Sequence, residues 1–234
     1  MTAMIEINNL RRVYRIGQEK VIALERIDLT IEKGEICCIL GTSGSGKSTL
    51  LNMIAGLEKP SRGEIKIGGR HIEKMTEAQL ALFRQKYIGF IFQAYYLLPN
   101  LTALENVCLP LTFRGIPKKR REAAGKKILE DVGLKKYMYH KPTEMSGGQQ
   151  QRVGIARAFV SNPPLILADE PTGNLDTHTT FEVIQQMTDL AHKHNQTLVI
   201  VTHDIEIADF VDRIIHIRDG KIEKDERRVK KEEM

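Results

Sequence analysis

The sequence predicts an α/β fold with a mostly parallel sheet core, an antiparallel β region at the N-terminus and a helical insertion. Short apolar stretches alternate with helical patterns through most of the chain, which favours parallel strands covered by helices on both faces. Near the N-terminus, "MIEINNL" and "RIDLTI" instead alternate apolar and polar residues, as strands with one exposed face do. The 234 residues suit one large domain or one domain with a sizeable insertion.

The first half of the chain is predicted to lead from a buried strand into a glycine loop. "EICCIL" is continuously apolar, which is typical of a central strand covered on both faces, and it runs directly into glycine-rich residues 41–49. "STLLNMIAGL" then predicts a helix, and "GEIKIGG" predicts a short strand bounded by glycines.

The middle of the chain, from about Thr102 to Lys141, is predicted to be helical. Its main pieces are "LENVCLPLTFRG" and "KKRREAAGKKILEDVGL", and a further helix follows Ser146. We expect a helical subdomain over about residues 94–162, inserted into a core made of residues 1–93 and 163–234. These helical pieces are punctuated by five residues, which are Pro99, Pro110, Pro117, Gly133 and Pro142.

Strand character returns after the insertion. "PLILADE" and "TLVIVTH" are predicted strands, with a helix between them from about Thr180 to His194. "RIIHIRDGKIEKD" predicts a hairpin with an Asp-Gly turn.

The composition limits the classes of function. Three cysteines without a C-x-x-C pair indicate small buried thiols in a reducing cytosol. We see no secretory signal and no stretch of roughly 18 apolar residues, so we expect a soluble protein, or one that reaches a membrane through a partner. The net charge of +5 lies largely in "KKRREAAGKK" and "KDERRVKKEEM". Glutamates within both stretches favour a solvated helix face and a frayed terminus, and no nucleic-acid partner is expected.

A phosphate-binding loop is predicted at "GTSGSGKST", which matches G-x-x-x-x-G-K-[ST] between a buried strand and a helix. Glycines let the backbone wrap closely around phosphate oxygens, Lys47 reaches the β- and γ-phosphates, and the Ser48 hydroxyl is placed for Mg²⁺. The alternative is an ordinary glycine-rich turn. The predicted nucleotide-binding residues of the loop are Gly41, Thr42, Ser43, Gly44, Ser45, Gly46, Lys47, Ser48 and Thr49.

An acid pair is predicted beside this loop, at the end of the strand "LILADE". Asp169 is expected to hold Mg²⁺ directly or through a water. Glu170 is expected to project towards the γ-phosphate, where it can orient and deprotonate the attacking water. The alternative is a pair of acids that merely caps a helix.

A second anion site is predicted at "EMSGGQQQRVGIARAF", where Ser146, Gly147 and Gly148 precede a helix. The hydroxyl, the backbone N–H groups and the helix dipole together favour a phosphate. Because this segment lies far along the chain from the first loop, we expect two copies to face head to tail, each clamping the ATP held by the other. The alternative is a plain helix start with Ser146 as its N-cap.

The motifs together resemble those of the ATP-binding cassette (ABC) ATPases. "MSGGQ" resembles the signature motif of this family, and "GTSGSGKST", "LILADE", "GNLD" and "VTHD" match it in order and spacing over essentially the whole chain. The resemblance implies a P-loop NTPase fold, ATP and Mg²⁺ as ligands, and a nucleotide bound between two subunits. It places Ser146, Gly148 and Gln149 against the partner's nucleotide.

The resemblance also implies roles for residues that are weak signals alone. Gln93 resembles the glutamine that senses the γ-phosphate and Mg²⁺, and His203 resembles the switch histidine that contacts the γ-phosphate and positions Glu170. Asp176 resembles an aspartate that communicates across the dimer, with a helix N-cap as its alternative. Tyr14 resembles the aromatic residue that stacks on adenine, with a surface strand tyrosine as its alternative. Met145 replaces the family's usual leucine, and we expect little effect.

The stretch "LADEPTGNLD" resembles exporters of the lipoprotein-release and macrolide-export type more than nutrient importers. A separate permease is therefore expected, with this chain cytoplasmic and peripheral on the inner face of the membrane. We expect residues of the loop "YYLLP" after Gln93 to contact the permease, or alternatively to pack on the helical insertion. The alternatives for function are a non-transport ABC ATPase, a division-associated one, or a free P-loop kinase or GTPase.

Overall fold

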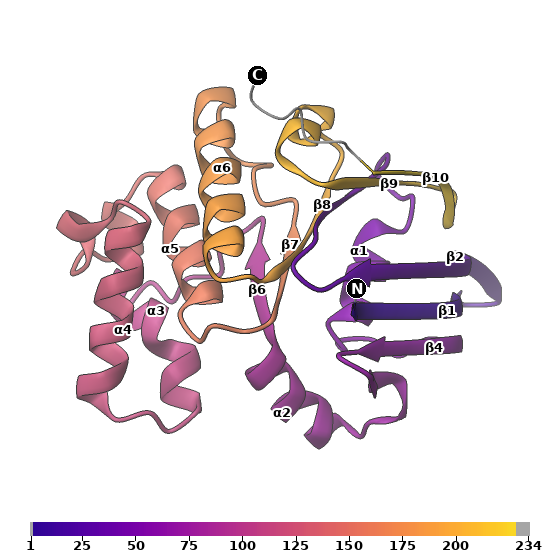
Figure 1. Ribbon diagram of the computed structural model, residues 1–234, viewed down its shortest axis with the longest axis horizontal. Coiled ribbons are helices and arrows are strands. Elements are labelled where there is room, and N and C mark those ends of the chain that lie inside the picture. The colour runs from indigo at the N-terminus through magenta and orange to yellow at the C-terminus, as the bar shows by residue number, and fades with distance from the viewer. Residues whose placement is uncertain (1, 228–234) are drawn as a thin grey trace.

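The computed structural model describes residues 2–227 and has two sheets with helices between and around them (Figure 1). The predicted basic tail is therefore described only as far as Arg227, and its remainder, 228–234, lies outside the described residues. The part from Lys224 to Arg227 belongs to a strand, so the prediction of a frayed terminus is wrong for these residues.

The larger sheet has six strands in the order β10-β9-β3-β8-β7-β6. Four of the five neighbouring pairs in this order run parallel, and only β10 and β9 pair antiparallel. The predicted mostly parallel core is thus confirmed. The strands are β3 (Ile36–Leu40), β6 (Ile88–Phe92), β7 (Leu165–Asp169), β8 (Thr197–Thr202), β9 (Arg213–Arg218) and β10 (Lys221–Arg227).

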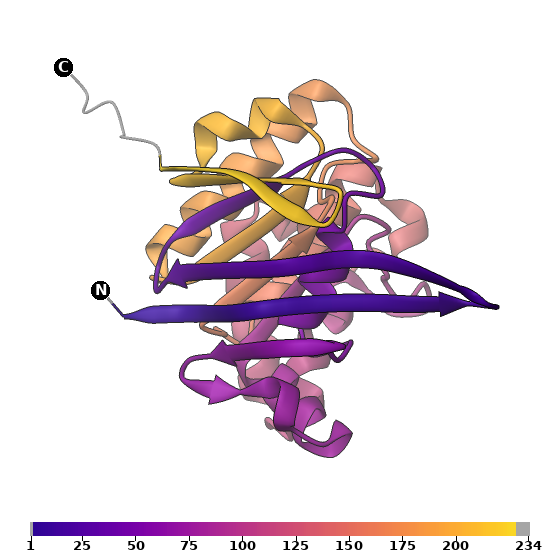
Figure 2. The same cartoon turned by 90° about the vertical axis from the view of Figure 1, so that its right-hand side faces the viewer.

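The smaller sheet is antiparallel, as the N-terminal patterns predict, with strands in the order β2-β1-β4-β5. Its first two strands form a long hairpin that crosses the front of the view in Figure 2. The strands are β1 (Ala3–Ile16), β2 (Glu19–Glu32), β4 (Arg62–Ile67) and β5 (Arg70–His71). β1 and β2 each have 14 residues and extend well beyond the stretches that predict them.

Six α-helices lie within residues 2–227. In Figure 1, α3, α4 and α5 gather on the side of the molecule away from the antiparallel sheet. All three helices belong to the segment that is predicted to be a helical insertion. The boundaries 94–162 of that insertion stay a prediction. The helices are α1 (Lys47–Ile54), α2 (Glu77–Tyr87), α3 (Ala103–Phe113), α4 (Lys118–Asp131), α5 (Gly147–Phe159) and α6 (Thr177–Lys193).

Strand β3 separates two hydrophobic cores because its successive side chains point to opposite faces. Ile36, Cys38 and Leu40 join a core with α3, α5 and α6, whereas Cys37 and Ile39 join a core with α1 and the antiparallel sheet. All three cysteines of the chain are buried and free, as expected. Burial raises the pKa of Cys38 to about 12, so this thiol stays protonated and inert at neutral pH.

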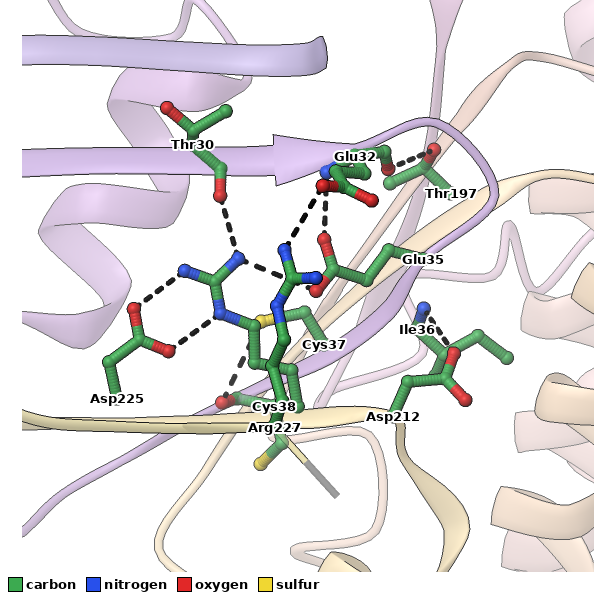
Figure 3. Close-up of polar contacts among 11 residues, drawn as sticks. Thr30, Glu32, Glu35, Ile36, Cys37, Cys38, Thr197, Asp212, Asp225 and Arg227 are labelled. Atoms are coloured by element: carbon green, nitrogen blue, oxygen red, sulfur yellow. Dashed lines mark hydrogen bonds and ion pairs between the residues drawn. The ribbon is translucent and has the colours of Figure 1, made fainter. Parts of the chain in front are cut away.

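The C-terminal hairpin β9–β10 turns at Asp219 and Gly220, whose φ angles of 48° and 72° suit the predicted Asp-Gly turn. At its other end, the side chain of Arg213 donates to both carboxylate oxygens of Asp225 at 2.6 Å and to the Thr30 carbonyl oxygen at 2.7 Å. Figure 3 shows how this polar cluster joins the hairpin to the ends of β2 and β3.

Candidate functional site

The glycine loop leaves the buried strand β3, enters α1 and lines a cleft of about 910 Å³. Its path leaves no room for larger side chains at two positions. A Cβ on Gly41 would lie 2.2 Å from the Ile217 carbonyl oxygen, and one on Gly46 would lie 2.5 Å from the Ala23 carbonyl oxygen. Gly46 also has a φ of 101°, which few residues other than glycine adopt. The sequence therefore needs glycine here for the loop to follow this path.

Lys47 begins α1, and its side chain is buried against the loop. Its ammonium group donates to the carbonyl oxygens of Gly41 at 2.8 Å and Thr42 at 2.9 Å. Within residues 2–227, the buried Ser45 hydroxyl has no hydrogen-bond partner. Buried hydroxyls are rarely left unpaired, and a phosphate oxygen is a partner of the right kind for this one. The loop therefore fits a phosphate ligand.

An acidic residue ends strand β7 beside the loop. The Ser48 hydroxyl donates to Asp169 Oδ1 at 3.0 Å. Burial raises the pKa of Asp169 above its usual value, and the hydrogen bond from Ser48 opposes this shift. A desolvated carboxylate beside a hydroxyl suits Mg²⁺, which takes few protein ligands and keeps water and phosphate oxygens. No group of three or more His, Cys, Asp or Glu side chains in the described part could hold a metal ion. A cation here would depend on such added oxygens.

Glu170 follows β7 with a φ of 45°, a strained angle for a residue other than glycine. Its backbone N–H donates to the Val201 carbonyl oxygen at 2.9 Å, which fixes the turn against the end of β8. Its carboxylate oxygen Oε2 lies 2.9 Å from His203 Nδ1, while Oε1 lies 4.0 Å from Lys47 Nζ. Strained residues of this kind concentrate at functional sites.

Gln93 follows the end of β6 and lines the same cleft. Its backbone carbonyl oxygen accepts a hydrogen bond from Asn174 Nδ2 at 3.0 Å. Its side chain packs against Gly173, where a Cβ would lie 2.6 Å from Gln93 Nε2. The structure thus brings Gln93, Glu170, His203 and the whole loop 41–49 to one cleft, with Asp169 reached through Ser48.

The second predicted anion site lies elsewhere. Ser146 is the N-cap of α5, which is the alternative interpretation of this segment. Its Oγ accepts a hydrogen bond from the Gln149 backbone N–H at 3.3 Å. Ser146, Gly148 and Gln149 line a separate cavity of about 400 Å³ together with Asp176. Asp176 in turn is the N-cap of α6, and hydrogen bonds from Thr179 lower its pKa. The structure does not bring these residues to the first cleft of the same chain.

Tyr14, like Asp169, is a predicted ligand that does not line the first cleft. It is half-buried on β1, where its hydroxyl donates to Glu58 Oε2 at 2.6 Å. The Arg12 guanidinium carbon lies 4.5 Å from the centre of its ring. Stacking of Tyr14 on adenine stays a prediction.

One side of the cleft is lined by residues that the sequence does not predict. Ala23 on β2 and His216, Arg218 and Glu223 of the C-terminal hairpin also line it. The Gly220 backbone N–H donates to the Ser45 carbonyl oxygen at 3.0 Å, so the turn of the hairpin braces the loop. The Asp-Gly pattern predicts the turn, but no local pattern indicates which element it packs against.

Comparison with known proteins decides the family. The ABC transporter family model matches residues 24–173, which include the glycine loop, the acid pair and the segment after Ser146. The chain belongs to the ABC transporter family. This confirms the resemblance and the P-loop NTPase fold that the motifs predict.

Two curated relatives of this ABC protein have names that mention lipoprotein release and macrolide export. The chain is 43% identical to the lipoprotein-releasing system ATP-binding protein LolD of Geobacter metallireducens, over 95% of this chain and 99% of the relative. It is 44% identical to the macrolide export ATP-binding/permease protein MacB of a Shewanella species, over 97% of this chain but 35% of the relative.

A solved structure supports the cassette architecture. The dimeric post-hydrolysis state of the ATP-binding cassette MJ0796, bound to ADP and Pi, superposes with a TM-score of 0.89 at 42% identity, covering 96% of this chain and 98% of that one. In the described residues of the present chain, every helix is too short or too polar to cross a membrane.

Proposed function

We propose that this chain binds and hydrolyses ATP as the ATPase subunit of an ABC transporter. One observation carries the proposal: the Glu170 carboxylate lies between His203 Nδ1, at 2.9 Å, and Lys47 Nζ, at 4.0 Å, on the rim of the phosphate-binding loop. A general base beside a cation that binds phosphate is the arrangement that phosphoryl transfer to water needs.

The proposed roles follow from the donors and acceptors present. Lys47 and the backbone of the loop bind the β- and γ-phosphates. Glu170 accepts the proton of the attacking water, which is typically worth about 10²–10⁴ in rate. His203 holds Glu170 in place and contacts the γ-phosphate, and Gln93 senses the γ-phosphate and changes position when it is bound or lost.

Mg²⁺ would be held by Ser48, Asp169 and Gln93, with phosphate oxygens and water as its other ligands. The cation would neutralise charge on the β- and γ-phosphates. The hydrogen bond between Ser48 and Asp169 already places two of these ligands within 3.0 Å of each other.

The site is proposed to be completed by a second copy of the chain. Ser146, Gly148 and Gln149 line a cavity of their own and do not line the cleft of Lys47. In a head-to-tail dimer, these residues of one copy would cover the γ-phosphate held by the other. The dimeric state of the MJ0796 cassette supports this arrangement.

Two substitutions test the chemistry. Lys47→Ala should weaken nucleotide binding and abolish turnover, because the buried cation that meets the phosphates is lost. Glu170→Gln should keep ATP binding but cut hydrolysis about 10²-fold or more, because an amide cannot accept the proton of water. Binding of a fluorescent ATP analogue and release of phosphate are the two measurements. Turnover near wild type in Glu170→Gln would exclude Glu170 as the base.

Oligomeric state tests the shared site. Since each subunit alone holds half of each site, the rate per subunit should rise with protein concentration in dilute solution. Glu170→Gln with Mg-ATP should accumulate dimers, because hydrolysis no longer resets them. Light scattering coupled to size-exclusion chromatography measures this. A monomer under these conditions, with ATP binding demonstrated, would contradict the reciprocal arrangement.

The partner is proposed to be a separate permease of the exporter type, which would place the chain on the cytoplasmic side of a membrane. The names of the LolD and MacB relatives support this. The predicted contact loop after Gln93 is only partly available, because Leu97 packs against the core, whereas Tyr96 and Leu98 are 65% and 49% exposed. Exposed apolar side chains on a loop are candidates for a partner surface.

A charge on this surface should break the contact without harming the enzyme. Leu98→Glu should abolish co-purification with the permease and leave the ATPase rate of the isolated chain nearly unchanged. Leu57→Glu is the matched control, because Leu57 is 50% exposed on a different loop. Retained co-purification in Leu98→Glu would place the contact elsewhere.

A non-transport or division-associated ABC ATPase is the alternative. It would share the catalytic residues and the dimer, so neither the substitutions of Lys47 and Glu170 nor the measurement of oligomeric state separates it from a transporter subunit. Identification of the membrane protein that co-purifies with the chain separates them, since only a transporter subunit has a substrate-carrying permease as partner.

A further inference from the structure

The loop directly after Gln93 has an unusual backbone. Tyr95 and Tyr96 have φ angles of 56° and 46°, so two consecutive residues with side chains adopt the left-handed region. This conformation crowds the Cβ against the backbone and normally suits glycine. Some interaction must therefore hold residues 95 and 96 in place.

Arg157 of α5 supplies that interaction. Its Nη2 donates to the Tyr95 carbonyl oxygen at 2.6 Å, and its Nη1 donates to the Tyr96 carbonyl oxygen at 2.5 Å. Burial lowers the pKa of Arg157, and within residues 2–227 no carboxylate offsets this shift. A partly desolvated guanidinium without a carboxylate needs its hydrogen bonds, so the two carbonyl groups and Arg157 depend on each other.

The ends of the same loop are held separately. Asn174 donates to the Gln93 carbonyl oxygen at the start. At the other end, the fully buried Asn106 accepts from the Leu98 backbone N–H at 2.7 Å and donates to the Leu98 carbonyl oxygen at 3.1 Å. Arg157 is therefore the side chain that fixes the middle of the loop by hydrogen bonds.

The loop also touches the first residue of α5. The Tyr95 hydroxyl lies 3.0 Å from the position that a Cβ on Gly147 would occupy. Gly147 directly follows Ser146, the N-cap of the helix. The two contacts, at Gly147 and at Arg157, join the loop that begins at Gln93 to the helix that begins at the second anion site.

We infer that Arg157 is a positioning residue, which holds the loop after Gln93 against α5 and so links Gln93 in one nucleotide cleft to the helix start that serves the other. This inference rests on the proposed function. Without Arg157, the loop can leave its left-handed conformation, and Gln93 and the start of α5 lose their fixed relation. The loop 41–49 is untouched, so a single chain should still bind ATP.

The first test measures the loop itself and needs no nucleotide. In hydrogen–deuterium exchange, the backbone amides of residues 94–98 should exchange faster in Arg157→Ala than in the wild type. Arg157→Lys, which keeps one charged donor group, should show an intermediate rate. Arg114→Ala is the matched control, because Arg114 likewise donates to a backbone carbonyl oxygen of this region, that of Ser161 at 3.2 Å, but does not touch the loop.

The second test measures the link to the nucleotide. The chain contains no tryptophan, so Tyr96→Trp gives a single fluorescent reporter in the loop. Mg-ATP should change its emission in the Glu170→Gln background, and Arg157→Ala should abolish this change. With Glu170 intact, Arg157→Ala should lower kcat on the order of tenfold to a hundredfold, the cost of slight misplacement, while KM for ATP stays within about threefold.

The outcomes separate this inference from the proposed function. Unchanged exchange at 94–98 in Arg157→Ala would overturn the inference, as would wild-type kcat with an unchanged tryptophan response. An equal increase in exchange at residues 94–98, or an equal fall in kcat, in Arg114→Ala would also overturn the inference. General packing between α3 and α5 would then explain the effect. Absence of ATP hydrolysis in the wild type would instead contradict the proposed function, and the exchange test would still decide the role of Arg157 in the loop. If Arg157→Ala does not fold, Arg157→Lys carries the same comparisons.

Discussion

The ion cluster around Arg213 gives a quantitative prediction for stability. Arg213 is 9% exposed and connects β9 to Asp225 on β10, Thr30 on β2 and Glu35, whose Oε1 lies 3.4 Å from Nη1 (Figure 3). Arg213→Ala would leave the Glu35 carboxylate, itself 10% exposed, without this cation, and the Thr30 carbonyl oxygen without its donor.

The magnitude follows from burial. Removing one partner of a buried ion pair costs about 3–5 kcal/mol, and we expect Arg213→Ala to lower the free energy of unfolding by about that amount. Asp225→Ala should cost less, about 1–2 kcal/mol, because charged hydrogen bonds are worth about 1.5–3 kcal/mol and water partly replaces them. Asp225 is 39% exposed, and Arg213 keeps Glu35 and Thr30.

The pH dependence has a definite sign. Hydrogen bonds from Arg213 lower the pKa of Asp225 in the folded state. A carboxylate with a lowered pKa stabilises the fold above its unfolded-state pKa, about 3.9, and this contribution is lost as the pH falls through the folded-state value. The difference in unfolding free energy between the wild type and Asp225→Ala should therefore be constant from about pH 7 to pH 5 and shrink below about pH 4.

Urea unfolding followed by circular dichroism measures these differences, since the chain has no tryptophan to report by fluorescence. Arg227→Ala is the control: Arg227 pairs with Glu32 at 3.1 Å but is 60% exposed, and an exposed pair is worth at most about 1 kcal/mol. Equal decreases in unfolding free energy in Arg213→Ala and Arg227→Ala would refute the reasoning from burial. A difference for Asp225→Ala that persists unchanged at about pH 3 would refute the assigned pKa shift.

Three further substitutions have expected outcomes. Gly41→Ala should weaken ATP binding at least about tenfold in a binding titration, because a Cβ 2.2 Å from the Ile217 carbonyl oxygen displaces the loop; unchanged affinity would contradict this. Tyr14→Ala should weaken the free energy of ATP binding by about 1–3 kcal/mol, because the ring is predicted to stack on adenine, whereas Tyr14→Phe should not; equal effects in a binding titration would point to the hydrogen bond with Glu58 instead. Met145→Leu, at a buried position, should change the unfolding free energy by less than about 1.5 kcal/mol.

The sequence predicts those strands whose side chains are buried on both faces of the sheet. β3, β7 and β8 are buried almost throughout and read as apolar strands. The outer half of the β1–β2 hairpin escapes prediction because it is exposed: Ile16 is 67% exposed and Ile22 is 48% exposed. Without a buried face, no alternation of apolar and polar residues marks these strands.

Three helices show what the local signals in the sequence predict and what they miss. α2, which no apolar periodicity predicts, begins with a capping box between Thr76 and Gln79, and the T-x-x-Q pattern of this box is present in the sequence. Pro110, one of the residues that punctuate the predicted helical pieces, lies inside α3, near its C-terminal end. α6 begins at Thr177, three residues before its predicted start, because Asp176 caps it.

For the candidate site, motifs predicted which residues gather at the cleft, but not what supports them. Lys47 and Glu170 follow from their motifs, and His203 follows from the family resemblance; the ends of neighbouring parallel strands then meet at one edge of the sheet. The bracing of the loop by Gly220 and the contact of Arg157 with residues 95 and 96 are long-range backbone contacts. A carbonyl group accepts a hydrogen bond whatever its side chain, so such contacts leave no pattern in the sequence.

The two predicted anion sites of one chain are therefore separate in space yet connected by structure. The cleft holds Gln93 at one edge, and the helix start at Ser146 lies in another cavity. Between them runs one loop whose strained backbone bonds to Arg157 of the same helix. A change in the position of Gln93 can reach the helix start through this loop, or through Asn174, which donates to the Gln93 carbonyl oxygen and lines the cavity of Ser146. Because the strained loop has few ways to deform while it stays bonded to Arg157, it favours movement of the loop and α5 as one unit. This is the property that a head-to-tail dimer with two shared nucleotides would need for both sites to close together.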